Sequence, residues 1–244
     1  MIVPSKKKEW ILLACIAGSV LYISFNIFAM VLYPGGTLID ENRIGYSLSE
    51  NFFSDLGMAM AYGGESKPGS RWLFMSALIL IGILLILFFI VFADFFVASK
   101  IEKYISRAGS AAGIAAGLSC IGIALTPWDL YFKAHMIFSY TFSISFILLA
   151  ILYAIVIQLS RTYYTRYAIV LLIYLVTLLV FLGLMIWGPS IDTPAGLRLL
   201  AVSQKIIIYS GMICLFIQFF GAYFYIKNIF KLSDMAKLGY SIRQ

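Results

Sequence analysis

The sequence predicts an all-α polytopic membrane protein, a bundle of six transmembrane helices with a short helix in its first outer loop. Hydrophobic residues make up 62% of the 244 residues and charged residues only 12%. So few charges could not cover the surface of a water-soluble domain. The apolar residues also form six runs, each close to the roughly 20 helical residues that cross about 30 Å of hydrocarbon.

The spans are expected to be helical because lipid offers no partner to backbone N–H and C=O groups, and the runs are too long for barrel strands. They cover residues 10–33, 72–98, 108–126, 134–158, 167–187 and 204–226. They form one domain over residues 1–244, with an outer loop at 34–71 and a cytoplasmic tail at 228–244.

The distribution of Lys and Arg predicts the orientation. Twelve of the 18 basic residues lie on the side of the bundle that carries both chain ends. Loops rich in Lys and Arg stay in the cytoplasm, so we expect a plasma-membrane protein with both termini inside. This arrangement also accounts for the net charge of +7, and no nucleic-acid partner is needed to explain it.

The third span is rich in small residues. Gly109, Gly113 and Gly117 repeat every four residues and so lie on one face of a helix. Such a face lets helix backbones approach closely in lipid. We expect it to pack against other helices of the chain, and a homo-oligomer seam is the alternative. The fifth span consists almost entirely of large aliphatic residues and is expected to face lipid.

No metal site or cofactor is expected. The three cysteines lie inside spans without paired spacing, which is typical of packing residues. The chain has one histidine, and a catalytic zinc normally takes three protein ligands.

The first loop contains a pattern typical of a helix start. Ser47 and Glu50 have the spacing of a capping box, which predicts a helix that continues to about Tyr62. Asn51 and Asp55 would then lie one turn apart on it.

Polar residues near the other outer loops are expected at the same depth in the membrane as this segment. We expect five of them to converge on one outer pocket: Asp55, Asp129, His135, Arg198 and Gln204. Ser139 continues the helical face that begins at His135. Ionisable groups at membrane depth are often functional. Alternatively, Asp55 and Asp129 neutralise Arg198 and Lys133 and only lock the loops.

Three motifs carry a family resemblance. They are Asn51-Phe52-Phe53-Ser54-Asp55-Leu56-Gly57, Pro127-x-Asp129 followed by His135, and Gly196-Leu197-Arg198. Together they resemble the prokaryotic six-helix membrane proteins of domain-of-unknown-function family nine-nine-eight. They are also distantly similar to the damage-regulated autophagy modulator-like proteins. The resemblance implies fold and topology, and it adds Asn51 and Ser54 to the candidate site. It implies no established reaction.

Three functions are compatible with these residues. In the first, the protein binds a membrane lipid or amphiphile, with Arg198, Lys133 and Lys205 at a headgroup phosphate. In the second it is an intramembrane lipid hydrolase, with His135 as base, Asp129 orienting it, and Ser139 or water as nucleophile. The third, a proton-coupled transporter, is less favoured because no inverted repeat is visible.

Overall fold

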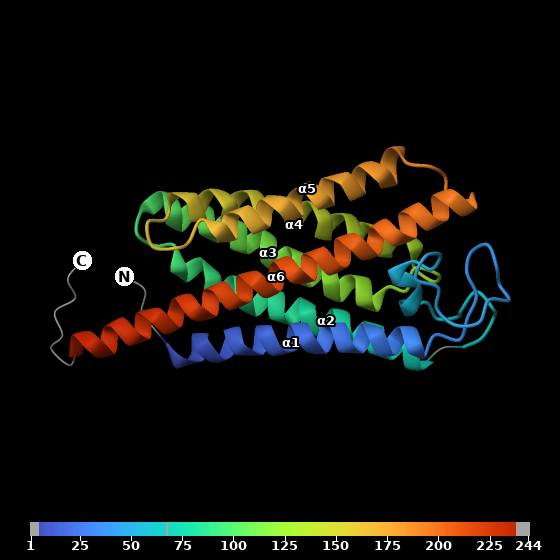
Figure 1. Ribbon diagram of the computed structural model, residues 1–244, viewed down its shortest axis with the longest axis horizontal. Helices are drawn as coiled ribbons and strands as arrows, with labels where there is room; N and C mark the ends of the chain where they lie inside the picture. The colour runs from blue at the N-terminus through green and yellow to red at the C-terminus, as the bar shows by residue number, and fades with distance from the viewer. Residues whose placement is uncertain (1–4, 67, 238–244) are drawn as a thin grey trace.

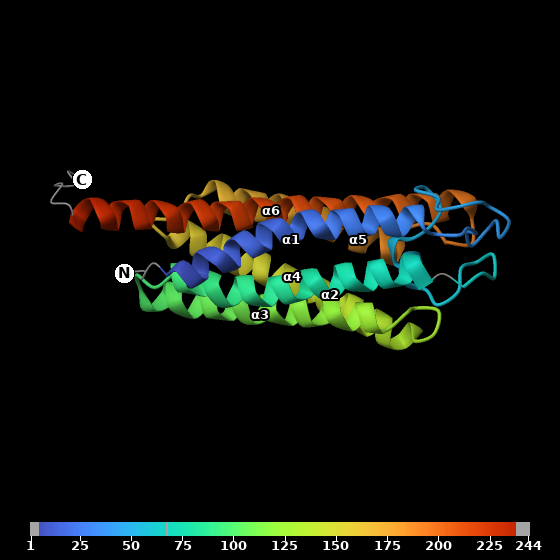
Figure 2. The same ribbon diagram turned by 90° about the horizontal axis from the view of Figure 1, so that it is seen from below.

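The structure, a computed structural model, describes residues 5–66 and 68–237. Six long helices run side by side between two ends of the bundle (Figures 1 and 2). They are α1 (Lys6–Val31), α2 (Pro68–Phe92), α3 (Lys100–Leu125), α4 (Phe132–Leu159), α5 (Arg166–Trp187) and α6 (Pro194–Lys237). Two short 3₁₀ helices are η1 (Phe53–Gly57) and η2 (Ala93–Phe95). All six long helices are long and apolar enough to cross a membrane, so the predicted fold class is confirmed.

The helices form a closed ring. Each long helix packs against the next one along the chain, and α6 returns to pack against α1. We call the end that carries residues 32–66 the loop end, and the end where α1 begins and α6 finishes the termini end (Figure 1).

The glycine face of α3 is buried inside the bundle. A Cβ at Gly109 would lie 2.9 Å from the Tyr153 ring of α4, and one at Gly113 would overlap the Phe89 ring of α2. A Cβ at Gly117 would lie 2.6 Å from the backbone oxygen of Gly82. Within one chain these glycines therefore seat α3 between α2 and α4.

Two helices extend well beyond the apolar runs from which they were predicted. The Ser99 side chain accepts a hydrogen bond from the Glu102 backbone N–H at 3.1 Å, so α3 begins at Lys100 instead of residue 108. Thr193 in the same way accepts from the Gly196 N–H at 3.1 Å, and Pro194 follows it at the first helical position, which suits its fixed φ. Apolar length alone misses such polar first turns.

The last helix is the longest. Its 44 residues correspond to about 66 Å at roughly 1.5 Å per residue, twice the hydrocarbon thickness of about 30 Å. The part of the predicted tail that the structure describes, residues 228–237, continues this helix. In contrast α5 is peripheral: only 17% of its most apolar window is buried, against 61% for α2.

Candidate functional site

The first loop folds over the loop end of the bundle with much less helix than predicted. A helix from Ser47 to about Tyr62 is wrong, because only the five residues of η1 are helical. The backbone N–H of Ser47 donates to the Asn51 side chain at 2.9 Å, and Glu50 binds arginines instead of closing a capping box. Ser47 and Glu50 thus bind other side chains and do not cap a helix.

Asp55 lies at the centre of this loop, 1% exposed. Its Oδ2 accepts from the Phe52 backbone N–H at 2.9 Å and from Asn51 Nδ2 at 3.2 Å, and its Oδ1 accepts from Trp128 Nε1 at 3.3 Å. Asn51, fully buried, also donates to the Gly36 carbonyl at 3.0 Å. The carboxylate therefore ties the first loop to the turn between α3 and α4.

Arg198 binds a carboxylate of the same loop. Its Nε and one terminal nitrogen donate to Glu50 Oε1 at 3.0 and 2.8 Å, while Arg43 contacts Oε2 at 3.1 Å. Glu50 is 5% exposed. The expectation that Asp55 or Asp129 neutralises Arg198 is therefore wrong, since Glu50 is its ion-pair partner.

Lys205 is buried beneath the loop. Its ammonium group donates to the carbonyls of Asn51 and Ala201 and lies 5.4 Å from the centre of the Tyr46 ring. The Tyr46 hydroxyl in turn donates to the Phe52 carbonyl at 3.1 Å. Burial, and after it the charge of Asp55, raises the pKa of Tyr46 above its usual value.

Asp129 holds the far part of the loop. Its Oδ2 accepts from the backbone N–H groups of Ala59 and Met60 at 2.8 and 3.3 Å. Its Oδ1 is buried and has no hydrogen-bond partner among the described residues. Asp129 thus contacts loop backbone, and among the described residues no hydrogen bond joins it to His135.

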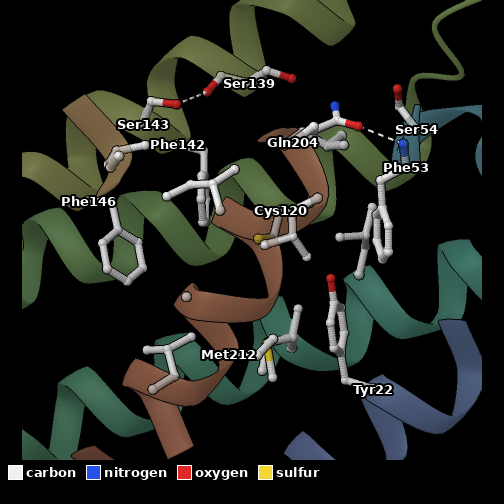
Figure 3. A pocket seen from close by; sticks show the side chains of 18 of the residues that line it. Tyr22, Phe53, Ser54, Cys120, Ser139, Phe142, Ser143, Phe146, Gln204 and Met212 are labelled. Atoms are coloured by element: carbon white, nitrogen blue, oxygen red, sulfur yellow. Dashed lines mark hydrogen bonds between the residues drawn. The ribbon is translucent and has the colours of Figure 1, made fainter. Parts of the chain in front are cut away.

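A cavity of about 180 Å³ lies beneath the loop, inside the bundle (Figure 3). Every long helix and η1 contribute to its walls, which are mostly aromatic and aliphatic. Wall residues drawn in Figure 3 include Tyr22, Phe53, Cys120, Phe142, Phe146 and Met212.

Five polar residues at the loop end face this cavity: Ser54, His135, Ser139, Ser143 and Gln204. Gln204 Oε1 accepts from the Phe53 backbone N–H at 2.6 Å, which positions η1 as the roof. His135 Nδ1 lies 2.8 Å from the Thr126 carbonyl. Because a carbonyl only accepts, Nδ1 carries the proton, and in the neutral ring Nε2 is the acceptor.

Deeper in the cavity, Tyr22 points its hydroxyl upward from α1 (Figure 3). Tyr22 lines the cavity. Because a buried tyrosine hydroxyl usually forms a hydrogen bond, Tyr22 offers a polar group to whatever fills the cavity.

The cavity lining holds no Asp, Glu, Lys or Arg among the described residues. Within the same part of the chain, no three His, Cys, Asp or Glu side chains gather closely enough to hold a metal ion. The cavity is therefore apolar with neutral hydrogen-bonding groups and one histidine.

The structure thus separates the candidate residues into two groups. Ser54, His135, Ser139 and Gln204 line the cavity, whereas Asn51, Asp55, Asp129 and Arg198 hold the loop above it. They share one end of the bundle without facing a common cavity. Sequence reasoning missed the role of Tyr22 as a cavity group, for which the only signal was a polar residue within the first span.

Comparison with known proteins gives one family. A model described as "Protein of unknown function (DUF998)" matches residues 16–220, most of the chain and all six helices at least in part. Searches of curated proteins and of solved structures returned no match.

Proposed function

The chain belongs to the DUF998 family of proteins of unknown function, and from that premise we propose that it binds one uncharged amphiphile in the cavity beneath its first loop. The observation that carries the proposal is the lining: apolar walls with neutral hydrogen-bonding groups at the loop end. Ligand sites typically combine mostly apolar surface with a few polar groups that fix orientation.

The electrostatics favour a neutral head over the phosphate suggested by the sequence. Arg198 is paired with Glu50, and Lys205 is bound by two backbone carbonyls. Lys133 is exposed and does not line the cavity. A phosphate in the cavity would be a buried charge without a counter-charge, which is costly. A hydroxyl or amide head needs only the hydrogen bonds that Ser54, Gln204 and Ser139 can supply.

The size of the cavity limits what enters it. An engineered apolar cavity of about 150 Å³ holds one benzene, so about 180 Å³ accommodates a ring or a short chain and its polar head. Partly exposed lining residues come from α4, α5 and α6, among them Phe142, Phe181 and Ile208. We infer that the rest of the ligand leaves between these helices into the lipid.

The hydrolase alternative has one observation in its favour: His135 and Ser139 line the same cavity. However, no hydrogen bond joins their side chains among the described residues, and the Thr126 carbonyl holds His135 where a catalytic carboxylate was expected. Binding therefore accounts for the geometry with fewer assumptions.

The proposal is tested with a cavity-filling variant and a matched control. Ser143 and Ser24 both donate to the carbonyl four residues earlier, but Ser143 lines the cavity whereas the Ser24 bond is exposed. The Ser143→Phe side chain should occupy most of the cavity, and Ser24→Phe should leave it open. Each protein is mixed in detergent with a short-chain monoacylglycerol or with lysophosphatidic acid, and bound mass is read by native mass spectrometry.

We expect monoacylglycerol on the wild type and on Ser24→Phe, and none on Ser143→Phe. Equal binding to all three proteins would refute the cavity as the site, and preference for lysophosphatidic acid would refute the neutral head. Release of glycerol from the monoacylglycerol by the wild type would replace binding with hydrolysis.

We also propose that the termini end faces the cytoplasm of a plasma membrane, on the strength of its excess of Lys and Arg. The three native cysteines are free and buried, so they give little background in labelling. A membrane-impermeant maleimide should label Glu41→Cys in intact cells and should label Lys100→Cys only after lysis. The reverse labelling pattern would show that the termini end faces outward and would refute this orientation.

A further inference from the structure

A second hollow lies between α5 and α6, towards the end where α5 begins. It is a surface groove of about 430 Å³, lined by Arg166, Tyr167 and Val170 from α5 and by Phe216, Phe220 and Phe224 from α6. None of these residues lines the cavity under the loop. The groove is therefore a separate feature of the bundle.

The α6 wall of the groove is an aromatic ladder. The ring centroids of Phe216 and Phe220 are 4.9 Å apart, and those of Phe220 and Phe224 are 5.5 Å apart. From Phe216 to Phe224 the helix rises about 12 Å, which is close to the roughly 15 Å depth of one leaflet. The ladder thus has the length of much of an acyl chain within a single leaflet.

Basic residues continue this ladder out of the membrane. At about 100° per residue, Lys227 and Lys231 fall within the same roughly 80° sector of α6 as the three phenylalanines. Both lysines are exposed. One helix face therefore changes from aromatic to cationic where it leaves the apolar layer.

Arg166 provides a fixed cation on the opposite wall. Its guanidinium lies 4.8 Å from the centre of the Tyr164 ring and 5.2 Å from that of Tyr167, contacts that restrict a flexible side chain. Among the described residues Arg166 has no ion pair. Asp94, an acidic residue at this end, is paired with Lys8 at 2.7 Å instead. The positive charge of Arg166 is thus available to a ligand.

We propose that this groove binds one anionic phospholipid from the leaflet at the termini end. The phosphate binds Arg166, whose planar fork suits phosphate oxygens. Lys227 lies beyond the groove lining, with its ammonium 5.3 Å from the centre of the Tyr223 ring, and adds only longer-range positive charge. One acyl chain lies along the phenylalanine ladder. One wall of the groove belongs to α5, whose apolar window is the least buried of the six candidate spans at 17%, and basic pockets between transmembrane helices select anionic headgroups. The proposal is independent of the amphiphile proposed for the cavity.

The test uses delipidated protein in detergent, with phosphatidylglycerol or phosphatidylcholine of identical acyl chains added back and retained lipid counted by native mass spectrometry. We expect wild type to retain phosphatidylglycerol about fivefold over phosphatidylcholine, the ratio for the ~1 kcal/mol that one basic residue, Arg166, adds near an anionic surface. Arg166→Gln should remove most of this preference, and Arg166→Lys should restore part of it. The matched control is Arg161→Gln, an exposed arginine nearby that does not line the groove.

The Phe220→Ala variant separates the acyl contact from the charge: it should lower retention of both lipids while keeping their ratio. Equal retention of the two lipids by the wild type, or equal effects of Arg166→Gln and Arg161→Gln, would overturn the proposal. A wild-type dimer that Phe220→Ala converts to a monomer would also overturn it, because the groove would then be an interface between two copies.

Discussion

Replacing Asp55 with alanine should open the first loop. The change removes the acceptor of three donors: the Phe52 backbone N–H, Asn51 Nδ2 and Trp128 Nε1. At about 1–2 kcal/mol for each donor left without its partner, the loss is ~4 kcal/mol. For a chain of about this size, 1 kcal/mol corresponds to roughly 2–4 °C in Tm, so Asp55→Ala should melt about 8–16 °C below wild type.

Two further variants make this measurement specific. Asp55→Asn keeps one oxygen acceptor but turns an NH₂ group towards one of the donors, so about half of the loss is expected. Asp192→Ala is the control, because Asp192 is exposed and, among the residues that the structure describes, its carboxylate accepts only from the Ser190 hydroxyl, at 2.8 Å. A surface change of this kind should alter stability by no more than about 0.5 kcal/mol.

Two readouts separate loop opening from global unfolding. Thermal unfolding in detergent, followed by tryptophan fluorescence, gives Tm. Trypsin cleavage after Arg43, which lies in the loop and is held by Glu50, reports the loop itself at temperatures far below Tm. If Asp55→Ala melts within 2 °C of wild type and is cleaved no faster after Arg43, the carboxylate does not hold the loop and the reasoning fails.

Three other predictions concern packing, pairing and pH. Gly117→Ala should destabilise the bundle by about 1–3 kcal/mol, since its Cβ would lie 2.6 Å from a backbone oxygen, whereas Gly183→Ala, whose Cβ meets nothing closer than 3.9 Å, should be neutral or stabilising in the same melt. Glu50→Gln should lower Tm by the equivalent of about 1–3 kcal/mol. If the Tm difference between wild type and this variant is the same in high salt, Glu50 stabilises the loop through packing and not through its charge. The pKa of Tyr46 is higher in the folded loop than its ordinary value of 10.0, so the folded state binds this proton more tightly than the unfolded state. The resulting stabilisation of the folded state is complete below about pH 10 and is lost as pH rises above it. Tyr46→Phe should therefore flatten the alkaline decline of Tm.

The bundle could be predicted from sequence because its determinants are local. Apolar length fixes each span, and small residues such as Gly113 fix which face of α3 packs closely. The boundaries were less predictable, since Ser99 and Thr193 start helices through side-chain hydrogen bonds that hydropathy does not measure.

The loop could not be predicted in the same way. The spacing of Ser47 and Glu50 is that of a capping box, but Glu50 has partners 7 and 148 residues away, and these win over the local bond. Likewise Asp129 and Gln204 bind backbone groups of a segment far from them in sequence. These long-range bonds decide which polar residues face the cavity. A prediction from polarity alone therefore placed the cavity-lining residues and the residues that hold the loop in one site.

Helix α6 contributes to both proposed ligand sites. It contributes Arg198, Gln204 and Lys205 at the loop end and the phenylalanine ladder towards the termini end, within one uninterrupted stretch of backbone. A helix held by its own hydrogen bonds moves as a stiff rod, so a shift that favours one ligand is transmitted to the residues that contact the other. If the two proposed ligands favour different positions of this rod, their affinities are linked, and by thermodynamic reciprocity each must change the other by the same factor.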